Sequence, residues 1–597
     1  MDKLKSLFHP PPSFKVITST TNPQSIPQST PQPESQPQTL NLLPPPQPAR
    51  SPNPPRILVI GAGSRGKSYA TAITHSSNGI VAAVAEPVEA VRKSFGRRFI
   101  WGLEGPKAGE EFGGWREFVE WEVKRRERRE KQKEEGGRDG DGDGDGDGKG
   151  DGKGDEVVID GVLVCTLDSM HREIIEGLAP LGLHVLSEKP LATGWEDCLG
   201  IYRALKGGSG SAGAGTGGTG EKEEAVFAIG HVLRYMPYNM LLHELVVEQG
   251  VVGEVVSVDH MESVGWWHFA HSYVRGNWRK ESVTAPTLLT KSCHDIDFLL
   301  WLLCSSSKGQ TKPHLPDRVS ASGSLNHFKK KRKPARAQGA TNCLSCPIES
   351  ECKYSSWKIY YEGGIKAGLG GWPVNIVLPD IEDYFDTVGL KGTEEKLREA
   401  LSQDYDATTM PAEEIEKRPW YGRCVYESDN NVCDDQTVTI SWEDDDDDTP
   451  VPGAGDDDKP TGRTAKTATF HMTAFSEPIC VHQTRIYGTR GEIEADRIKG
   501  IITVRDFATH TSTKHRPHPS VGGHGGGDHG LIRQFVLAID DVKNHGVSVE
   551  EAQRARMGCT TEDILRSHAM VFAAEEARKG KKVVDWEGWW RENVGEW

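Results

Sequence analysis

The 597-residue chain lacks the features that mark secreted and membrane-spanning proteins. Its first residues, MDKLKSLFHPPPSF, contain no apolar leader, and no uninterrupted apolar run approaches the ~18–20 residues that cross a bilayer. It has only eleven cysteines, and with no such leader these favour free thiols in a reducing compartment. We therefore expect a cytoplasmic protein that has no membrane partner.

The chain also lacks an excess of basic residues that would attract nucleic acid. Its net charge is −16, and two short runs supply −14 of this. Residues 139–155 carry seven Asp and two Lys, and residues 443–458 carry nine acids and no base. The remainder is nearly neutral, so we expect neither nucleic acid nor an acidic membrane as a partner.

Low-complexity segments interrupt an otherwise regular sequence. Residues 1–55 hold 15 of the 35 prolines, which predicts a disordered Pro/Gln-rich tail. Three further stretches are typical of loop insertions: residues 122–155, 207–220 and 443–460.

The remaining sequence predicts an α/β protein with two domains. From residue 56 to 224, apolar strand-like segments alternate with helix-like segments, which indicates a parallel sheet with crossover helices. Residues 225–597 contain several alternating strands and two long closing helices, which favour a second α/β domain with a large, mostly antiparallel open sheet.

A glycine-rich loop follows the first predicted strand. Gly61, Gly63 and Gly66 form a GxGxxG pattern between RILVI and a predicted helix, with Ser64 and Arg65 inside it. The pattern suits a tight turn, a close approach of backbone to pyrophosphate and close helix packing. Together with the acid Glu86 after the second strand, it predicts a Rossmann dinucleotide site. Glu86 favours NAD over NADP. Arg65 weakens this preference, because a nearby arginine can bind the 2′-phosphate of NADP.

A lysine stands at the end of a later strand in the same domain. The segment LHVLSEKP places Glu188 and Lys189 at the carboxyl edge of the parallel sheet, where ligands of open α/β sheets bind. We expect Lys189 to exchange a proton with a substrate hydroxyl. The preceding strand ends at Thr166, Asp168 and His171, which we expect on the nicotinamide side.

A histidine opens the apolar helical run in TLLTKSCHDIDFLLWLL. His294 is either a polar helix start or a catalytic group, and the neighbouring cofactor cleft favours catalysis.

At these motifs the chain resembles the Gfo/Idh/MocA oxidoreductases, which include glucose-fructose oxidoreductase and inositol dehydrogenase. The matching segments are VIGAGSRG, VCTLDSMH, SEKPLATG, GHVLRYMPYN, KSCHDIDFLLWLL, TRIYGTRGEIEAD and GHGGGDHGLIRQF. The resemblance implies hydride transfer between NAD(P) and a secondary alcohol of a sugar or cyclitol. It also implies a homo-oligomer through the C-terminal sheet.

The resemblance assigns the catalytic lysine to Lys189 and the catalytic histidine to His294. The family often has an Asp four residues before that histidine, where this chain has Thr290 followed by Lys291. Proton transfer would then rest on Lys189 and His294, helped by Lys291. We expect a polyol or sugar substrate to meet Arg234, Tyr235, Asp295, His524 and Asp528, although core or turn roles are equally open to them.

Four cysteines lie within one stretch of the second domain. Cys343 and Cys346 form a CxxC half-site, followed by Cys352 and Cys424. They are either ligands of a structural zinc or reduced thiols in a long loop.

Three functions remain open at this stage. The first is an NAD(P)-dependent dehydrogenase of a sugar, sugar acid or cyclitol. The second is a redox-neutral enzyme that uses NAD for epimerisation or glycoside cleavage. The third is a dinucleotide-binding regulator without turnover, which the basic cluster KKKRK (329–333) favours mildly.

Overall fold

The computed structural model describes residues 38–41, 48–49, 51–136, 157–207, 225–305, 312–379, 381–450, 461–518 and 522–595. Most of the expected proline-rich tail, and the central parts of the three expected insertions, lie outside these residues. None of the helices in the described ranges combines the length and the apolarity that a bilayer crossing requires.

The first domain is built on a six-stranded parallel sheet, as expected. The strand order is β4-β3-β2-β5-β6-β7, and the strands β2, β3 and β5 are apolar and buried along most of their lengths because helices cover both faces. The strands are β2 (Arg56–Ile60), β3 (Ile80–Ala85), β4 (Glu111–Phe112), β5 (Gly161–Val164), β6 (His184–Ser187) and β7 (Phe227–Ile229). Its helices are α1 (Ser64–Ser76), α2 (Glu89–Phe99), α3 (Trp115–Gly136), α4 (His171–Leu178) and α5 (Trp195–Leu205).

The second domain carries a ten-stranded sheet in the order β1-β17-β16-β15-β14-β8-β13-β10-β9-β18. All neighbours are antiparallel except the pairs β8/β13 and β1/β17. The strands are β1 (Gln38–Asn41), β8 (Val255–Ser263), β9 (Arg318–Ser324), β10 (Asp435–Trp442), β13 (Lys466–Thr473), β14 (Val481–Gly488), β15 (Gly491–Asp496), β16 (Ile501–Asp506), β17 (Ser512–Arg516) and β18 (Val583–Asp585). A separate pair consists of β11 (Asp445–Pro450), which lies inside the acidic loop insertion expected at residues 443–460, and β12 (Thr461–Arg463), which follows it.

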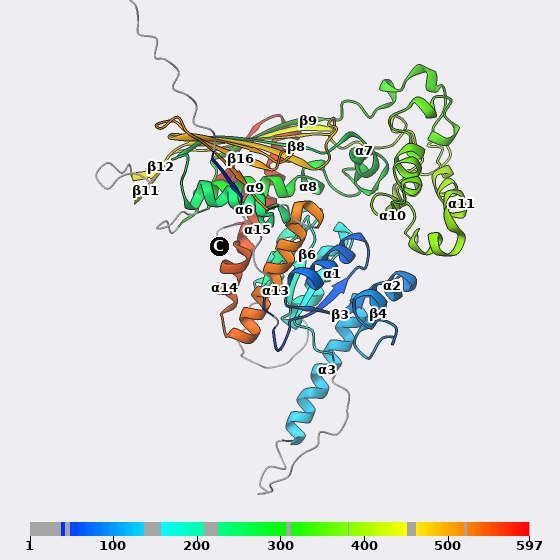
Figure 1. The fold of residues 1–597 in the computed structure, drawn as a ribbon, viewed down its shortest axis with the longest axis horizontal. Helices are drawn as coiled ribbons and strands as arrows, with labels where there is room; N and C mark the ends of the chain where they lie inside the picture. The colour runs from blue at the N-terminus through cyan, green and yellow to red at the C-terminus, as the bar shows by residue number, and fades with distance from the viewer. Residues whose placement is uncertain are drawn as a thin grey trace, which may run out of the picture.

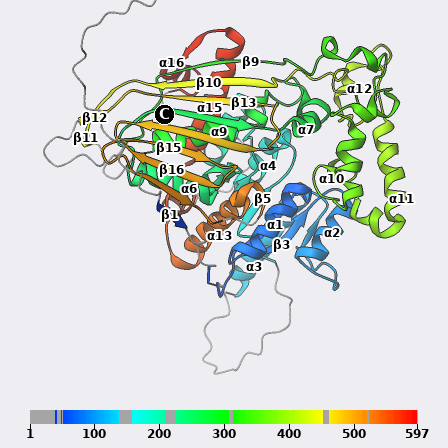
Figure 2. The same cartoon turned by 45° about the horizontal axis from the view of Figure 1, so that its top comes forward.

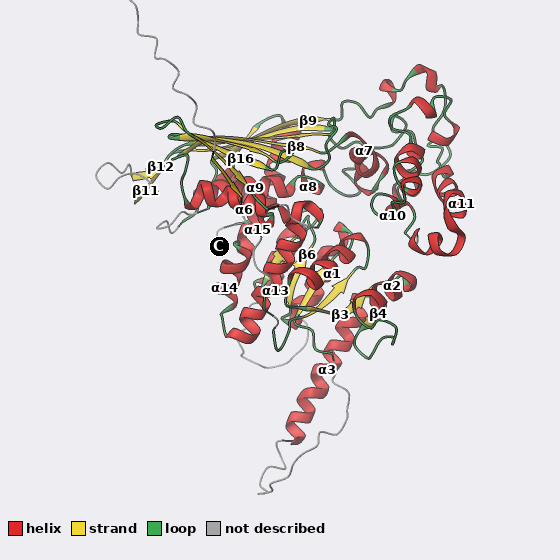
Figure 3. Ribbon diagram, viewed as in Figure 1, coloured by secondary structure: helices red, strands yellow, loops and turns green. Residues whose placement is uncertain are grey.

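The large sheet forms a layer above the first domain, with helices between the two (Figures 1 and 3). Along β10 every second residue is buried, so one face packs on the helices and the other lies toward solvent. The helices of this part are α6 (Pro237–His243), α7 (Trp266–Phe269), α8 (Thr287–Thr290), α9 (Cys293–Cys304), α13 (Gly527–His545), α14 (Val549–Ala552), α15 (Thr561–Gly580) and α16 (Trp586–Asn593).

The domain division at residue 224 does not divide the hydrophobic core. Leu531, Phe535 and Ile539 of α13 are buried together with β2 and β5 of the first domain. The apolar face of α13 therefore completes the core of the first domain. A helix near the C-terminal end of the chain thus packs on strands near its beginning.

Besides β11, two elements form within segments that were expected to lack regular structure. Helix α3 continues to Gly136, into the expected insertion 122–155, where Arg125 and Arg126 both bind the buried carboxylate of Glu122. Strand β1 lies within the expected tail and pairs in parallel with the edge strand β17. An edge strand offers unpaired backbone groups, which explains why an otherwise polar segment pairs there.

A long segment between β9 and β10, residues 325–434, leaves the sheet and forms a small helical body beside α7 (Figure 2). It contains α10 (Val374–Val377), α11 (Ile381–Ser402) and α12 (Ala412–Glu416). We call it the β9–β10 segment.

Candidate active site

The glycine loop has the geometry of a dinucleotide-binding turn. Gly61 has φ +89°, and a Cβ there would lie 2.5 Å from the Cys165 carbonyl oxygen. A Cβ on Gly66 would lie 2.1 Å from the Gly61 carbonyl oxygen, so α1 packs too closely for a side chain. No atom lies within 4 Å of a Cβ on Gly63, and the helix begins at Ser64 without a side-chain cap. An open space before uncapped helix N–H groups fits a pyrophosphate.

Glu86 braces this loop from the end of β3. One carboxylate oxygen accepts the Ala62 N–H at 2.9 Å, and the other accepts the Val88 N–H at 2.9 Å. Each oxygen keeps a second lone pair. The expected contact with a ribose hydroxyl therefore stays a prediction that this geometry allows.

Arg65 is occupied by two carboxylates rather than free for a phosphate. Its Nε donates to Glu188 at 2.8 Å, and its two terminal nitrogens donate to Asp528 at 2.9 and 3.0 Å. Burial alone would raise the pKa of Asp528, but Arg65 and His524 hold it far below its usual range. Asp528 and His524 therefore tie α13 to α1, and the expectation that they contact substrate stays a prediction.

The turn after β6 aims Lys189 across the domain boundary. Its Nζ donates to the Thr290 carbonyl oxygen of α8 at 2.6 Å. The next residue, Pro190, places its carbonyl oxygen 2.8 Å from Nδ1 of His171. His171 is fully buried, so it supports this turn rather than lining the nicotinamide side as expected.

The end of β5 offers one free polar atom to a cofactor. The Thr166 hydroxyl is buried and has no hydrogen-bond partner among the described residues. It stands beside Gly61, whose Cβ would lie 3.4 Å from the Thr166 methyl carbon. Asp168 instead accepts a hydrogen bond from the Trp278 indole of the second domain at 2.8 Å.

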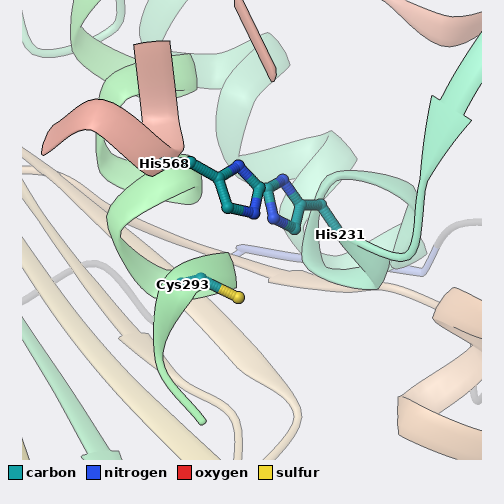
Figure 4. A group of neighbouring side chains, drawn as sticks. All are labelled: His231, Cys293 and His568. Carbon is teal, nitrogen blue, oxygen red and sulfur yellow. The ribbon is translucent and has the colours of Figure 1, made fainter. Parts of the chain in front are cut away.

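Close to the turn after β6 are His231, Cys293 and His568, whose ligand atoms are within 4.8 Å of one another (Figure 4). His568 Nε2 accepts the Leu191 N–H at 2.9 Å, and its Nδ1 lies 2.8 Å from the Ile564 carbonyl oxygen. Burial lowers the pKa of His568 to about 3 and raises that of Cys293 to about 12. Because both His568 nitrogens are engaged, we interpret the group as neutral packing rather than a metal centre.

His294 lies in the first turn of α9, directly after Cys293. Its imidazole is buried, and neither nitrogen makes a hydrogen bond to the described residues, although Nε2 lies 3.4 Å from Asp295 Oδ2. Burial and the nearby Lys291 and Lys189 lower its pKa well below the usual value. The site therefore holds a buried, neutral imidazole.

A carboxylate that the sequence analysis missed lies beside it. Lys291 forms a buried ion pair with Glu262 of β8, and the Ser292 hydroxyl donates to the same carboxylate at 3.1 Å. Burial and the nearby Asp295 raise the pKa of Glu262. Glu262 thus supplies the carboxylate that position 290 lacks, from a neighbouring strand instead of the same helix.

The sequence did contain a signal for Glu262: it is a polar residue at an inward-facing position of a strand. Strand β8 alternates, and its buried positions include His260 and Glu262. Polar groups on the buried face of an alternating strand are uncommon and mark functional sites.

Asp295 lies next to His294, with Oδ2 3.4 Å from His294 Nε2, and its expected substrate role stays a prediction. It is fully buried; one oxygen lies 3.1 Å from His260 Nε2 and 2.9 Å from His482 Nε2. Glu262, His294, Asp295 and His482 have ligand atoms within 4.8 Å of one another. The ammonium of Lys291 already pairs with this group, which favours a proton-transfer network over a metal site.

Arg234 and Tyr235 make contacts of the kind expected for a core role, the alternative that the sequence left open. Arg234 binds Asp297 of α9 through two hydrogen bonds of 2.6 and 2.8 Å, both side chains being buried. The Tyr235 hydroxyl donates to the Met557 carbonyl oxygen at 2.9 Å. Their contact with substrate stays a prediction.

Aromatic side chains form the surroundings of His294 and Lys291, and some of them come from the β9–β10 segment. His268 Nδ1 lies 3.3 Å from Cys480 Sγ, whose thiol is close enough to affect the charge of Lys291. The Trp372 ring of that segment packs on the edge of His268, with ring centroids 4.8 Å apart. In the same segment, Cys343, Cys346, Cys352 and Cys424 line one cavity.

Comparisons with known proteins find similar chains. The sequence model of the Gfo/Idh/MocA oxidoreductase family, described as having an NAD-binding Rossmann fold, matches residues 153–211. "Putative oxidoreductase YteT" of Bacillus subtilis is 20% identical over 401 residues, which are 65% of this chain and 74% of that protein. The 2,7-anhydro-N-acetylneuraminate hydratase of Escherichia coli is 28% identical over 146 residues, which are 24% of this chain and 34% of the hydratase.

Solved structures of similar fold include a levoglucosan dehydrogenase in complex with NADH and levoglucosan. It is 15% identical with a TM-score of 0.49, covering 89% of this chain and 99% of that one. An oxidoreductase of Agrobacterium radiobacter in complex with NAD+, L-tartaric acid and magnesium is 12% identical with a TM-score of 0.48, covering 90% and 99%.

The family match falls on the part of the first domain that carries Lys189 and its supports. The glycine loop, the lysine turn and the histidine helix occur in the order of the motifs on which the resemblance rests. Over residues 153–211 the chain is similar to the Gfo/Idh/MocA family of NAD-binding oxidoreductases.

Proposed function

We propose that the protein transfers a hydride between NAD and a secondary alcohol of a sugar, sugar acid or cyclitol. One observation carries this proposal: a buried, neutral His294, whose nitrogens make no hydrogen bond to the described residues, stands in the first turn of α9, and its charge state is affected by Lys189. A neutral imidazole and an ammonium next to each other suit the exchange of a hydroxyl proton.

The cofactor is held by residues of the first domain. The N-terminus of α1 and the open space at Gly63 would receive the pyrophosphate, and Glu86 the ribose. When bound, NAD supplies the hydride acceptor. We propose NAD rather than NADP because Glu86 repels a 2′-phosphate and Arg65 is engaged by Glu188 and Asp528.

In the proposed proton transfer, Lys189 orients the substrate hydroxyl while His294 takes or returns its proton. The Thr290 carbonyl oxygen holds the Lys189 ammonium in place. Lys291, paired with Glu262 behind His294, disfavours the imidazolium and so keeps His294 neutral and able to accept a proton. Lys291 thus acts as a positioning residue in this proposal, because its ammonium is committed to Glu262.

The substrate class follows from the walls of the site. Trp372 and His268 present aromatic faces and edges next to polar groups, an arrangement that suits a polyhydroxylated ring. The expected oligomer through the outer face of the large sheet remains a prediction.

A redox-neutral reaction is the second candidate. A relative, the Escherichia coli 2,7-anhydro-N-acetylneuraminate hydratase, carries the name of a hydratase and acts on a sugar acid. The same lysine and histidine would move protons in either case.

The test is a screen of the purified full chain against sugars, sugar acids and cyclitols, with NAD and NADP supplied separately. We expect a substrate-dependent rise in NADH absorbance with NAD. Lys189→Ala should lower kcat by at least about 100-fold, because it removes a positioned proton-transfer group. The exposed Lys107→Ala is the matched control and should leave kcat unchanged.

Three results would count against the proposal. Equal turnover in Lys189→Ala would remove the lysine from the chemistry, and preference for NADP would overturn the cofactor assignment. Consumption of a substrate without an absorbance change, with NADH shown to bind by fluorescence, would replace hydride transfer with the redox-neutral reaction.

A further inference from the structure

The β9–β10 segment brings four cysteines to one place. Cys343, Cys346, Cys352 and Cys424 line a single cavity of about 340 Å³. Cys343 and Cys346 belong to a CxxC turn that starts with a short 3₁₀ helix at Cys343–Ser345. All four are free thiols.

Backbone pairing explains how the fourth cysteine, far along the chain, reaches the other three. Asn342 and Arg423 form an antiparallel bridge. On either side of it, the Cys343 N–H donates to the Gly422 carbonyl oxygen at 2.8 Å, and the Cys424 N–H donates to the Thr341 carbonyl oxygen at 2.7 Å. The CxxC turn and Cys424 are therefore held in adjacent chains.

A buried arginine without a carboxylate partner stands against this cavity. Arg275 is fully buried, and its hydrogen bonds go to the carbonyl oxygens of Arg423 and Tyr354, both at 2.6 Å, and to Cys343 Sγ at 3.3 Å. Its Nη1 has no hydrogen-bond partner, and no carboxylate of the described ranges lies within 4.0 Å of the guanidinium. A buried cation of this kind is expensive unless an anion faces it.

We propose that Cys343, Cys346, Cys352 and Cys424 bind a structural zinc ion. Four thiolates around Zn²⁺ carry a net charge of −2, so the centre supplies the anion that Arg275 lacks. The Arg275 hydrogen bond to Cys343 Sγ is then a charge-assisted contact to a zinc-bound sulfur. With four protein ligands the centre leaves no open coordination position, which makes it structural rather than catalytic.

Zinc binding requires the four sulfurs to move closer together. Two other groups of described residues already have three or more ligand atoms within 4.8 Å of one another, and the four cysteines are not among them. Cys343, Cys346 and Cys352 lie within ten residues of chain, and backbone pairing holds Cys424 beside Cys343.

A zinc centre would support the outer part of this segment. Some buried apolar residues of the segment, among them Phe328, Tyr354 and Val425, belong to the second main core. Others form two small clusters: one of seven residues around Tyr360 and Leu397, the other of Tyr405, Ile415 and Trp420. Clusters this small rarely hold a fold by themselves. The zinc would hold the segment that places Trp372 against His268.

The experiment measures metal content in the full chain purified without chelator from zinc-supplemented cells. We expect one equivalent of zinc per chain by mass spectrometry of the metal, retained after dialysis. Cys346→Ser and Cys424→Ser should each lose it. Cys433→Ser is the matched control, because Cys433 is a buried cysteine of the same segment that does not line the cavity, and it should keep its zinc.

A second readout does not depend on the variants folding. Wild-type protein exchanged with Co²⁺ should show the thiolate-to-cobalt charge-transfer and visible bands of a tetrahedral sulfur site. Absence of metal from wild type, iron with visible absorption in place of zinc, or zinc retained by Cys346→Ser and Cys424→Ser would each overturn the proposal.

Discussion

At the scale of single residues, the three glycines of the loop after β2 differ in what a side chain would meet. Gly61 and Gly66 exclude a Cβ because carbonyl oxygens lie 2.5 and 2.1 Å from its position. Gly63 has φ −71° and open space around it, so the protein's own packing does not require a glycine there. A ligand that approaches the backbone at Gly63 would require one.

Gly63→Ala therefore separates folding from cofactor binding. We expect the free energy of unfolding to change by less than about 0.5 kcal/mol, since nothing clashes. The affinity for NADH should fall at least about tenfold, since the new methyl group enters the space that the pyrophosphate would use. Fluorescence titration with NADH and denaturant unfolding measure the two quantities.

Gly66→Ala is the comparison for that experiment. It places a Cβ 2.1 Å from the Gly61 carbonyl oxygen and should destabilise the chain by roughly 1–3 kcal/mol. Unaltered NADH affinity in Gly63→Ala would contradict the placement of the pyrophosphate.

At the scale of elements, neighbouring polar residues in the first turn of α9 contact different parts of the molecule. Asp295 lies next to His260 and His482, whereas Asp297 binds Arg234. At about 100° per residue, Asp295 and Asp297 point to nearly opposite sides of the helix. In the proposed mechanism the motif HDID is therefore partly catalytic, through His294, and partly structural.

Asp297→Asn tests the structural half of this motif. Burial would raise the pKa of Asp297, but Arg234 and His231 outweigh it and hold the pKa far below its usual range. Removing the charge leaves a buried arginine unpaired, so the free energy of unfolding should fall by about 3 kcal/mol. KM for substrate should not change, in contrast to the substrate role that the sequence favoured for Arg234.

The matched control for that variant is Glu587→Gln. It breaks an exposed pair with Arg591 and should change the free energy of unfolding by less than about 0.5 kcal/mol. A large rise in KM with unchanged stability in Asp297→Asn would return Arg234 to the substrate site.

At the scale of the whole molecule, buried histidines set the response to acid. Burial lowers the pKa of His184 and His243 to about 4, and that of His271 and His568 to about 3. In the unfolded chain each has a pKa of about 6.5. Below that pH these histidines bind protons in the unfolded chain but stay neutral in the folded chain.

We therefore expect stability to fall as pH drops from about 6.5 to about 4. Each of these histidines lowers the free energy of unfolding by up to about 1.4 kcal/mol per pH unit in that window. Above pH 6.5 both states hold these imidazoles neutral and the contribution is constant. Denaturant midpoints recorded from pH 8 to pH 4 measure the slope.

A variant identifies the source of that slope. His243→Gln should make the dependence shallower, whereas the exposed His545→Gln should leave it unchanged. An equally steep dependence in His243→Gln would assign the acid response to carboxylates instead.

The sequence by itself determined the fold class. Periodicity predicts the parallel sheet, the antiparallel sheet and the two closing helices, because the pattern of buried side chains follows the local repeat of each element. The glycine pattern is equally local, since tight turns and close packing act over a few residues.

Only the tertiary structure decided which polar residues meet. Glu262 and Lys291 are 29 residues apart in sequence and pair because the turn between α8 and α9 meets β8. Arg65, Glu188 and Asp528 come from three distant elements, and Arg234 binds Asp297 of another element. Charge pairing between distant elements depends on packing, and packing has no repeat in the sequence that a local pattern can reveal.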